Sequence, residues 1–246
     1  MDRLIYTSLT AMRGAMARQT VIASNLANAN TTGFRAEIAN SQSLWTTGGP
    51  ANARVLASEE VLAADMDAGT VTETGRALDI ALSGDALLAI QAKDGDEAYT
   101  RRGDLMLSDT GLLTTGDGAP VLGEGGPVTL PPADSVRIEA DGTVWIVPEG
   151  GDPTQPSQVE RLKLVTPAGS AVVKGIDGHF RVEGGGALPS DPDARLTAGA
   201  LEGSNVNATQ ALVDMIDASR AWETQIKLLS TAREIDDAGA KLMQLN

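Results

Sequence analysis

The chain has 246 residues, and its 19 basic and 33 acidic side chains give a formal net charge of −14. A chain this acidic lacks the clustered Lys and Arg that nucleic-acid binding requires, so nucleic-acid partners are excluded as a class. It has no cysteine and one histidine, which excludes disulfides, zinc fingers, iron–sulfur clusters and multi-histidine metal sites. We therefore expect neither a metal nor another cofactor.

No apolar run approaches the roughly 18 residues of a membrane helix, so we expect no membrane insertion. The first residues also lack the basic segment and short apolar core of a secretory signal peptide. If the protein leaves the cytosol, we expect it to be exported by another route, without a cleaved signal peptide.

The first segment, from Asp2 to about Ala29, contains no Pro and one Gly, which favours a long helix. At the α-helical rise it would span roughly 40 Å. Gly33 suits the left-handed residue that follows many helices, so we expect Thr31-Thr32-Gly33 to end this one. Apolar or small residues and one Gln recur along it with 4-3-4-3 spacing, which forms a seam on one side of a helix: Ile5, Leu9, Met12, Met16, Gln19, Ala23 and Leu26.

Residues 36–70, with Gly48-Gly49-Pro50, predict a linker or loop region. Residues 71–203 predict a β-rich domain, because turn dipeptides punctuate short alternating runs. Asp141-Gly142 and Asp177-Gly178 each lie between apolar runs and predict hairpins. The spacing of the turns favours an irregular antiparallel sandwich or barrel.

The last segment, from Asn207 to Leu245, again has no Pro and one Gly. Asn207 followed by Gln210 predicts a helix start. The helix would span roughly 57 Å, which is long for a globular domain. Its seam has 3-4-3-4 spacing and consists of Leu212, Met215, Ser219, Trp222, Ile226 and Leu229.

These elements predict an α+β fold in which long N- and C-terminal helices pair as an inner, coiled-coil-like domain. This discontinuous helical domain would contain residues 1–35 and 204–246, with the β-rich domain between them. An apolar seam left open along such helices would aggregate or stay disordered. The two seams must therefore pair with each other or with neighbouring subunits, which indicates a self-assembling structural protein.

The sequence gives less support to an enzyme than to a self-assembling structural protein. His179 could be the base of a serine-type triad, but it follows a turn dipeptide and no Gly-x-Ser-x-Gly element is present, so we interpret it as an exposed hairpin residue. The 25 acidic residues between positions 41 and 203 guarantee chance carboxylate pairs. A secreted β-rich glycan-binding or hydrolytic protein remains the alternative from another class. We expect no enzymatic activity.

Three ordered motifs carry a family resemblance. The segment Asn25-Leu26-Ala27-Asn28, followed by Thr32-Gly33-Phe34-Arg35, resembles the N-terminal signature of bacterial flagellar rod and hook proteins. The middle and C-terminal signatures of that family are similar to Tyr99-Thr100-Arg101-Arg102-Gly103 and to Leu201-Glu202-Gly203-Ser204-Asn205-Val206. The opening Met1–Thr7 and the short region 36–70 are similar to proximal-rod members; a distal-rod or hook-type subunit is the alternative within the family.

The resemblance implies a structural subunit of the flagellar rod, the driveshaft that transmits torque across the periplasm. It implies a tube of paired terminal helices, assembled from copies of this chain and from other rod proteins, proximal and distal. It also implies export by the flagellar type III apparatus and a location in the basal body.

We expect the subunit contacts to come from the seam residues and from two asparagines beside the seam. Asn25 and Asn28 would make inter-subunit hydrogen bonds that set the register, or alternatively would serve only the end of their own helix. The expected interface residues are Ile5, Leu9, Met12, Met16, Asn25, Leu26, Asn28, Leu212, Met215, Trp222, Ile226 and Leu229.

Overall fold

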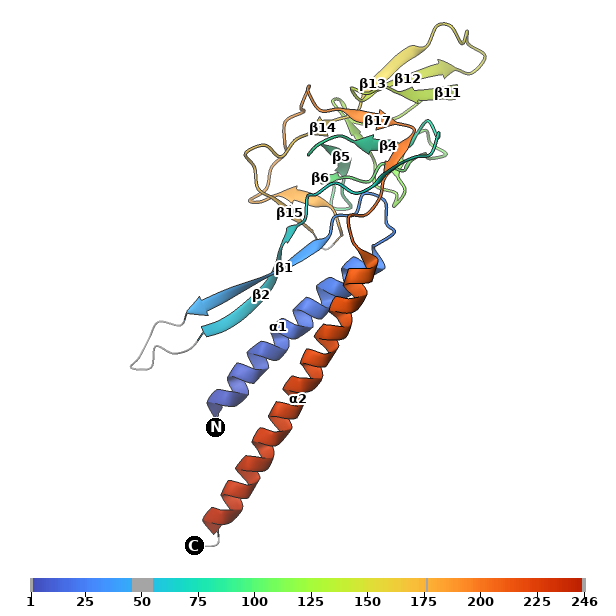
Figure 1. The fold of residues 1–246 in the computed structure, drawn as a ribbon. Helices are drawn as coiled ribbons and strands as arrows, with labels where there is room; N and C mark the ends of the chain where they lie inside the picture. Colours follow the sequence, from blue (N-terminus) through green and yellow to red (C-terminus); the bar gives the residue numbers. More distant parts are fainter. Residues whose placement is uncertain (1, 46–54, 176, 245–246) are drawn as a thin grey trace. The chain divides into compact units, whose positions relative to one another are not determined.

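A computed structural model describes the backbone of residues 2–45, 55–175 and 177–244, and most side chains from Leu9 onward apart from those of residues 39–63. The chain forms two compact units. The first, which we call the helical unit, contains residues 1–27, 37–63 and 207–246. The second, the β unit, contains residues 28–36 and 64–206. The expected combination of terminal helices and a β-rich middle is confirmed (Figure 1).

Two long helices, α1 (Asp2–Ala27) and α2 (Ala208–Gln244), account for most of the helical unit. The strands of the described residues are β1 (Glu37–Trp45), β2 (Val55–Ala64), β3 (Val71–Glu73), β4 (Ile80–Leu82), β5 (Leu87–Gln91), β6 (Glu97–Thr100), β7 (Leu105–Leu107), β8 (Leu113–Thr115), β9 (Leu122–Gly123), β10 (Gly126–Pro127), β11 (Ala133–Ile138), β12 (Thr143–Pro148), β13 (Ser157–Arg161), β14 (Leu164–Val165), β15 (Val172–Lys174), β16 (Phe180–Val182), β17 (Leu196–Ala198) and β18 (Ala200–Glu202).

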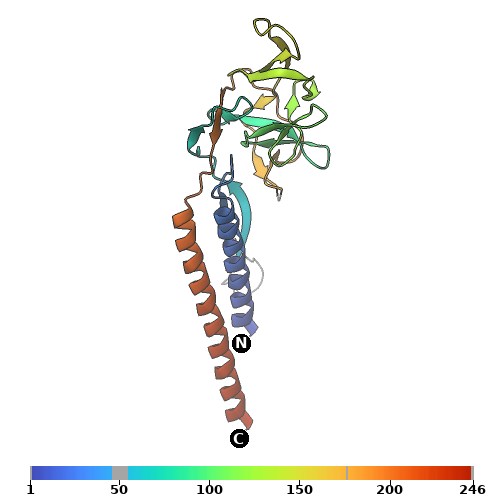
Figure 2. The same cartoon turned by 90° about the vertical axis from the view of Figure 1, so that its right-hand side faces the viewer.

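The ends of the two helices follow the local chemistry that the sequence indicates. After α1 the chain turns at Gly33, which has the left-handed φ of 66°. Asn207 caps α2, since its Oδ1 accepts a hydrogen bond from the backbone N–H of Gln210 at 3.1 Å. The helices contact each other and lie side by side in two perpendicular views (Figures 1 and 2). Neither has a described stretch long and apolar enough to cross a membrane.

The segment 36–70 contains more regular structure than the linker expected there. Strands β1 and β2 pair as a two-stranded sheet, and β1 contacts α1. The Gly48-Gly49-Pro50 run lies outside the described residues. The Gly and Pro residues of this segment predicted a linker. The strands on either side of them show little of the regular apolar–polar alternation that reveals a strand.

The β unit consists of small antiparallel sheets. The largest has five strands in the order β14-β5-β6-β16-β15, and the next has the order β11-β12-β13. Both hairpins predicted from Asp-Gly turns are confirmed: β11 pairs with β12 across Gly142, and β15 pairs with β16 across Gly178. Each of these glycines has a positive φ, of 86° and 82°, which side chains rarely adopt and glycine allows.

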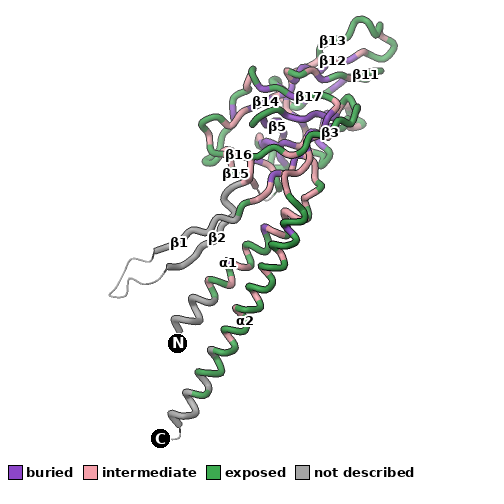
Figure 3. The backbone as a smooth tube through the Cα atoms, viewed as in Figure 1, coloured by how far each residue is buried: buried purple, intermediate pink, exposed green. Residues whose placement is uncertain are grey.

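Buried apolar residues concentrate in the β unit, and most of the residues drawn purple, as buried, in Figure 3 lie there. A large aliphatic cluster includes Ile80, Leu88 and Leu105, and a smaller one surrounds Tyr99 and Phe180. The described parts of the two helices are mostly exposed or half-buried. The apolar core that stabilises the fold therefore lies in the β unit, and the described parts of the helices contribute few buried residues to it.

Candidate subunit interface

The contact between α1 and α2 uses small side chains. On α1, Gly14 and Val21 are buried and lie seven residues apart, on the same side of the helix. They line a groove of about 730 Å³ whose opposite wall includes Ala218 and Ala221 of α2, together with Asp214. Small residues let two helix backbones approach closely. This explains why this side of α1 contacts α2 although the side has few large apolar groups.

The apolar seam expected on α1 does not coincide with this contact. Leu9 is 44% exposed and Met16 is 56% exposed. At about 100° per residue both lie roughly 120–160° around the helix from Gly14 and Val21. Leu9 and Met16 therefore point away from the side of α1 that contacts α2. Met12 and Leu26 are half-buried, and the side chain of Ile5 lies outside the described set.

On α2 the expected seam is only partly covered. Met215, Trp222 and Leu229 are half-buried, whereas Leu212 and Ile226 are 50% and 47% exposed. The least exposed described residues of α2 recur at 4-3-4-3-4 spacing, which is typical of a coiled-coil seam: Ala211, Met215, Ala218, Trp222, Gln225 and Leu229. Leu212, Ile216 and Ile226 form a second stripe beside this one that remains exposed.

The two asparagines make contacts within their own subunit. The side chain of Asn25 donates to the carbonyl of Glu37 at 2.9 Å and accepts from the N–H of Glu37 at 2.8 Å. This pair of bonds ties α1 to the start of β1. Asn28 accepts from the Thr31 hydroxyl at 3.0 Å. These contacts agree with the helix-end role, and the inter-subunit role of the two asparagines stays a prediction, since an amide can accept two and donate two hydrogen bonds.

A buried ionic cluster joins the three sequence motifs, and sequence reasoning did not anticipate it. The side chains of Arg35, Arg101 and Glu202 are each about 1% exposed. Glu202 Oε1 lies 2.7 Å from Arg35 Nη2, and Glu202 Oε2 accepts from Arg101 Nη2 at 2.6 Å. The presence of a charged residue in each motif was the available signal. Burial lowers the pKa of Arg101, and the charge of Glu202 opposes that change.

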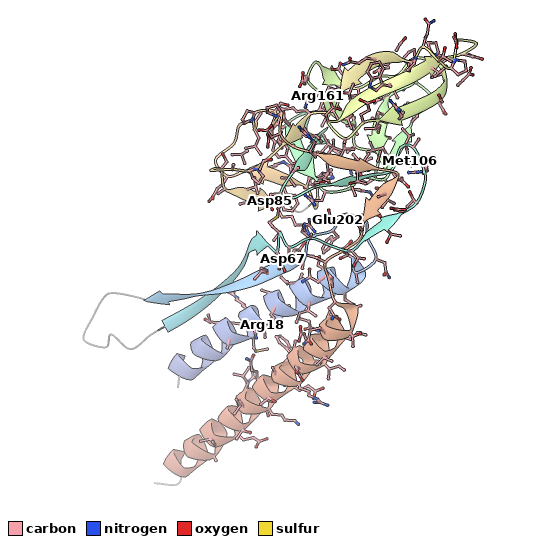
Figure 4. The ribbon with its side chains drawn as sticks, turned by 45° about the horizontal axis from the view of Figure 1, so that its top comes forward. Arg18, Asp67, Asp85, Met106, Arg161 and Glu202 are labelled. Carbon is pink, nitrogen blue, oxygen red and sulfur yellow. The ribbon has the colours of Figure 1, made fainter. Side chains whose placement is uncertain are left out.

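The same region fastens the segments that continue into the two helices. The Gly33 N–H donates to the Glu202 carbonyl at 2.8 Å. Asn205 accepts from the N–H of Ala36 at 2.7 Å and donates to the carbonyls of Asp65 and Asp67 at 3.0 Å. Figure 4 labels Asp67 and Glu202 in this part of the β unit. The segment that follows α1 and the segment that precedes α2 are thus joined by hydrogen bonds within the β unit.

The described residues do not form a metal centre. No group of three or more His, Asp or Glu side chains among them is arranged to hold a metal ion. The features of the described helical unit are instead two helices in contact, a narrow covered seam and exposed apolar stripes. Such stripes are typical of protein–protein contact surfaces.

Comparisons with known proteins agree along the whole chain. Three family models match: "Flagella basal body rod protein" over residues 5–35, "Flagellar hook protein FlgE/F/G D1 domain" over 81–146, and "Flagellar basal body rod FlgEFG protein C-terminal" over 197–242.

The relatives include the flagellar basal-body rod protein FlgF of Salmonella typhimurium, 40% identical over 100% of both chains. FlgF of Escherichia coli is 41% identical over 100% of this chain and 98% of the relative. The rod protein FlgG of Bacillus subtilis is 32% identical over 96% of this chain and 97% of the relative. With full-length similarity to FlgF, the chain belongs to the flagellar basal-body rod protein family.

Proposed function

We propose that this structural rod subunit assembles through the outward apolar stripes of α1 and α2, which pack against the helices of neighbouring axial subunits. The observation that supports this is the exposure of Leu9 and Met16 on α1 and of Leu212, Ile216 and Ile226 on α2. The neighbours would be copies of this chain and other flagellar axial proteins. A head-to-tail contact of this kind, repeated without closing a ring, builds a helical tube.

The energetics support assembly as the step that stabilises the helices. Ordering a helix costs roughly 1–2 kcal/mol of backbone entropy per residue. Within one subunit, Gly14, Val21 and Ala211 are the buried residues of the described parts of α1 and α2. Neighbouring subunits would cover the stripes and add the missing apolar burial. Helix ordering and assembly would then be coupled, with the two helices paired as a coiled coil inside the tube.

The mechanical role follows from this arrangement. Closely packed helices resist sliding because side chains interlock at their interfaces. A tube of such helices would transmit torque as a driveshaft that spans the periplasm, and this role requires no catalysis. We further propose export by the flagellar type III apparatus, without a cleaved signal peptide. The higher identity to the two FlgF proteins than to B. subtilis FlgG favours a proximal position in the rod.

The test is the double variant Leu9→Gln with Met16→Gln. Both side chains are exposed in the subunit, so the variant should fold with an unchanged melting temperature. It should nevertheless fail to enter isolated basal bodies and should abolish swimming in a strain that depends on this chain. Met106→Gln is the matched control, because Met106 is 51% exposed on the β unit (Figure 4).

The control should assemble and swim normally. Normal rods from the double variant would refute the role of the outward stripe. Equal loss in the Met106 variant would show that loss of assembly is not specific to the helical stripe, which would also contradict the proposal.

A further inference from the structure

The histidine of this chain lies at a junction between two turns of the β unit. His179 follows the turn of the β15–β16 hairpin, which forms one edge of the five-stranded sheet. Sequence reasoning placed it on an exposed hairpin, but its side chain is only 14% exposed. Another part of the β unit therefore covers it.

The imidazole lies between two carboxylates. Its Nε2 is 3.0 Å from Oδ2 of Asp117, in the turn after β8, and its Nδ1 is 3.4 Å from Oδ2 of Asp177 in its own hairpin. A neutral imidazole has a proton on one nitrogen and can donate to one acceptor, whereas the imidazolium donates from both. Nδ1 is buried and makes no hydrogen bond of normal geometry. A proton there gains its counter-charge from Asp177.

The surrounding charges favour the protonated form. Arg181 of β16 donates to both oxygens of Asp177, at 2.9 and 2.8 Å, and lies 3.5 Å from Asp94 in the β5–β6 turn. Around Asp117, Arg102 lies 4.0 Å away and is itself paired with Asp104 at 2.7 Å.

The four carboxylates near His179 thus face two arginines, so a proton on the imidazole reduces an excess of negative charge. The hydrogen bond with Asp117 raises the pKa of His179, against the opposing effect of burial, and holds the pKa of Asp117 below its usual range.

The hairpin that His179 fastens has a second contact near the same turn, since Lys174 pairs with Phe180, the residue after His179. Lys174 of β15 donates to the carbonyl of Arg35 at 2.9 Å, and its Nζ lies 3.6 Å from the centre of the Phe34 ring. Phe34 and Arg35 belong to the segment that follows α1. The turn end of the hairpin therefore contacts both the turn after β8 and the segment after α1.

We propose that His179 is a pH-sensitive fastener: the imidazolium bridges Asp117 and Asp177, and its deprotonation loosens the β15–β16 hairpin and the contact of Lys174 with the segment after α1. The direction in which pH changes the stability follows from the proton bound by His179. Because the folded protein holds the proton more tightly than the unfolded chain, the stabilisation is complete below the ordinary histidine pKa of about 6.5. It is lost as the pH rises through the higher pKa of the folded protein.

The test is an NMR titration of the full-length, unassembled chain, in which the single histidine gives one unambiguous imidazole signal. The midpoint should lie above about 6.5. The backbone amide signals of Lys174 and Arg35 should move with the same midpoint. His179→Gln should remove that movement in both amides. A midpoint at or below the ordinary value, or amides that ignore the titration, would overturn the proposal.

A second variant separates the Asp117 contact from general surface charge. Asp117→Asn should lower the midpoint by about one pH unit or more, the usual effect of removing a neighbouring opposite charge. Asp109→Asn, at an exposed residue of the β7–β8 turn, removes the same charge elsewhere and should leave the midpoint nearly unchanged. Equal shifts in the two variants would refute the specific bridge. Neither outcome depends on rod assembly, so the proposal stands apart from the proposed function.

Discussion

Glu202 compensates two buried cations. Its carboxylate pairs with Arg35 and Arg101, and its Oε1 also accepts the N–H of Gly69 at 2.9 Å. Arg35 Nε and Nη1 are buried and make no hydrogen bond with any residue that the structure describes. Glu202→Gln would leave two guanidinium groups without a counter-charge, so we expect a loss of about 3–5 kcal/mol. Urea unfolding of the full-length chain measures it.

The matched control for that change is Glu149→Gln, at an exposed residue after β12. It removes the same charge at the surface and should alter stability by less than about 0.5 kcal/mol. A Glu202 variant as stable as this control would mean that water or rearranged side chains stabilise the buried arginines. The three-residue cluster would then be dispensable for folding.

Among the elements, the turn after α1 depends on a close backbone approach. A Cβ on Gly33 would lie 2.4 Å from the carbonyl carbon and oxygen of Arg101, and these backbone atoms cannot rotate away. Gly75 has a similar φ, 72° against 66°, but has open space around its Cβ position. Gly75→Ala should cost about 1–2 kcal/mol from φ alone. Gly33→Ala should cost clearly more, and equal melting temperatures for the two variants would contradict the close approach.

The elements also show where sequence reasoning succeeded and where it could not. Helix ends and Asp-Gly hairpins depend on a few neighbouring residues, so Asn207, Gly33 and Gly142 revealed them. The side of α1 that contacts α2 could not be found from apolar spacing. Gly14 lies on that side because it lets the two helices approach closely, and it adds no apolar side chain that the spacing would reveal. The ionic cluster joins Arg101 to a residue 101 positions away, and no local pattern records such a pairing.

The whole molecule divides its stabilisation unequally between its units. The β unit contains two apolar clusters, whereas the described part of the helical unit buries little apolar surface. Regions with few buried apolar contacts open first, and proteases cut the opened form. The two units of an unassembled subunit should therefore differ in their resistance to a protease.

Limited trypsin digestion of the monomer tests this difference. Cleavage should occur early at exposed helical sites such as Arg18, Arg220 and Lys227. Arg137 is the internal control: its side chain is 69% exposed, but it lies in β11, and cleavage there requires the sheet to open. A fragment close to residues 28–206 should accumulate from the monomer, and isolated basal bodies should protect the helical sites. Simultaneous cleavage at Arg137 and Arg220 would mean that both units are equally stable before assembly, and coupling between helix ordering and rod growth would then be refuted.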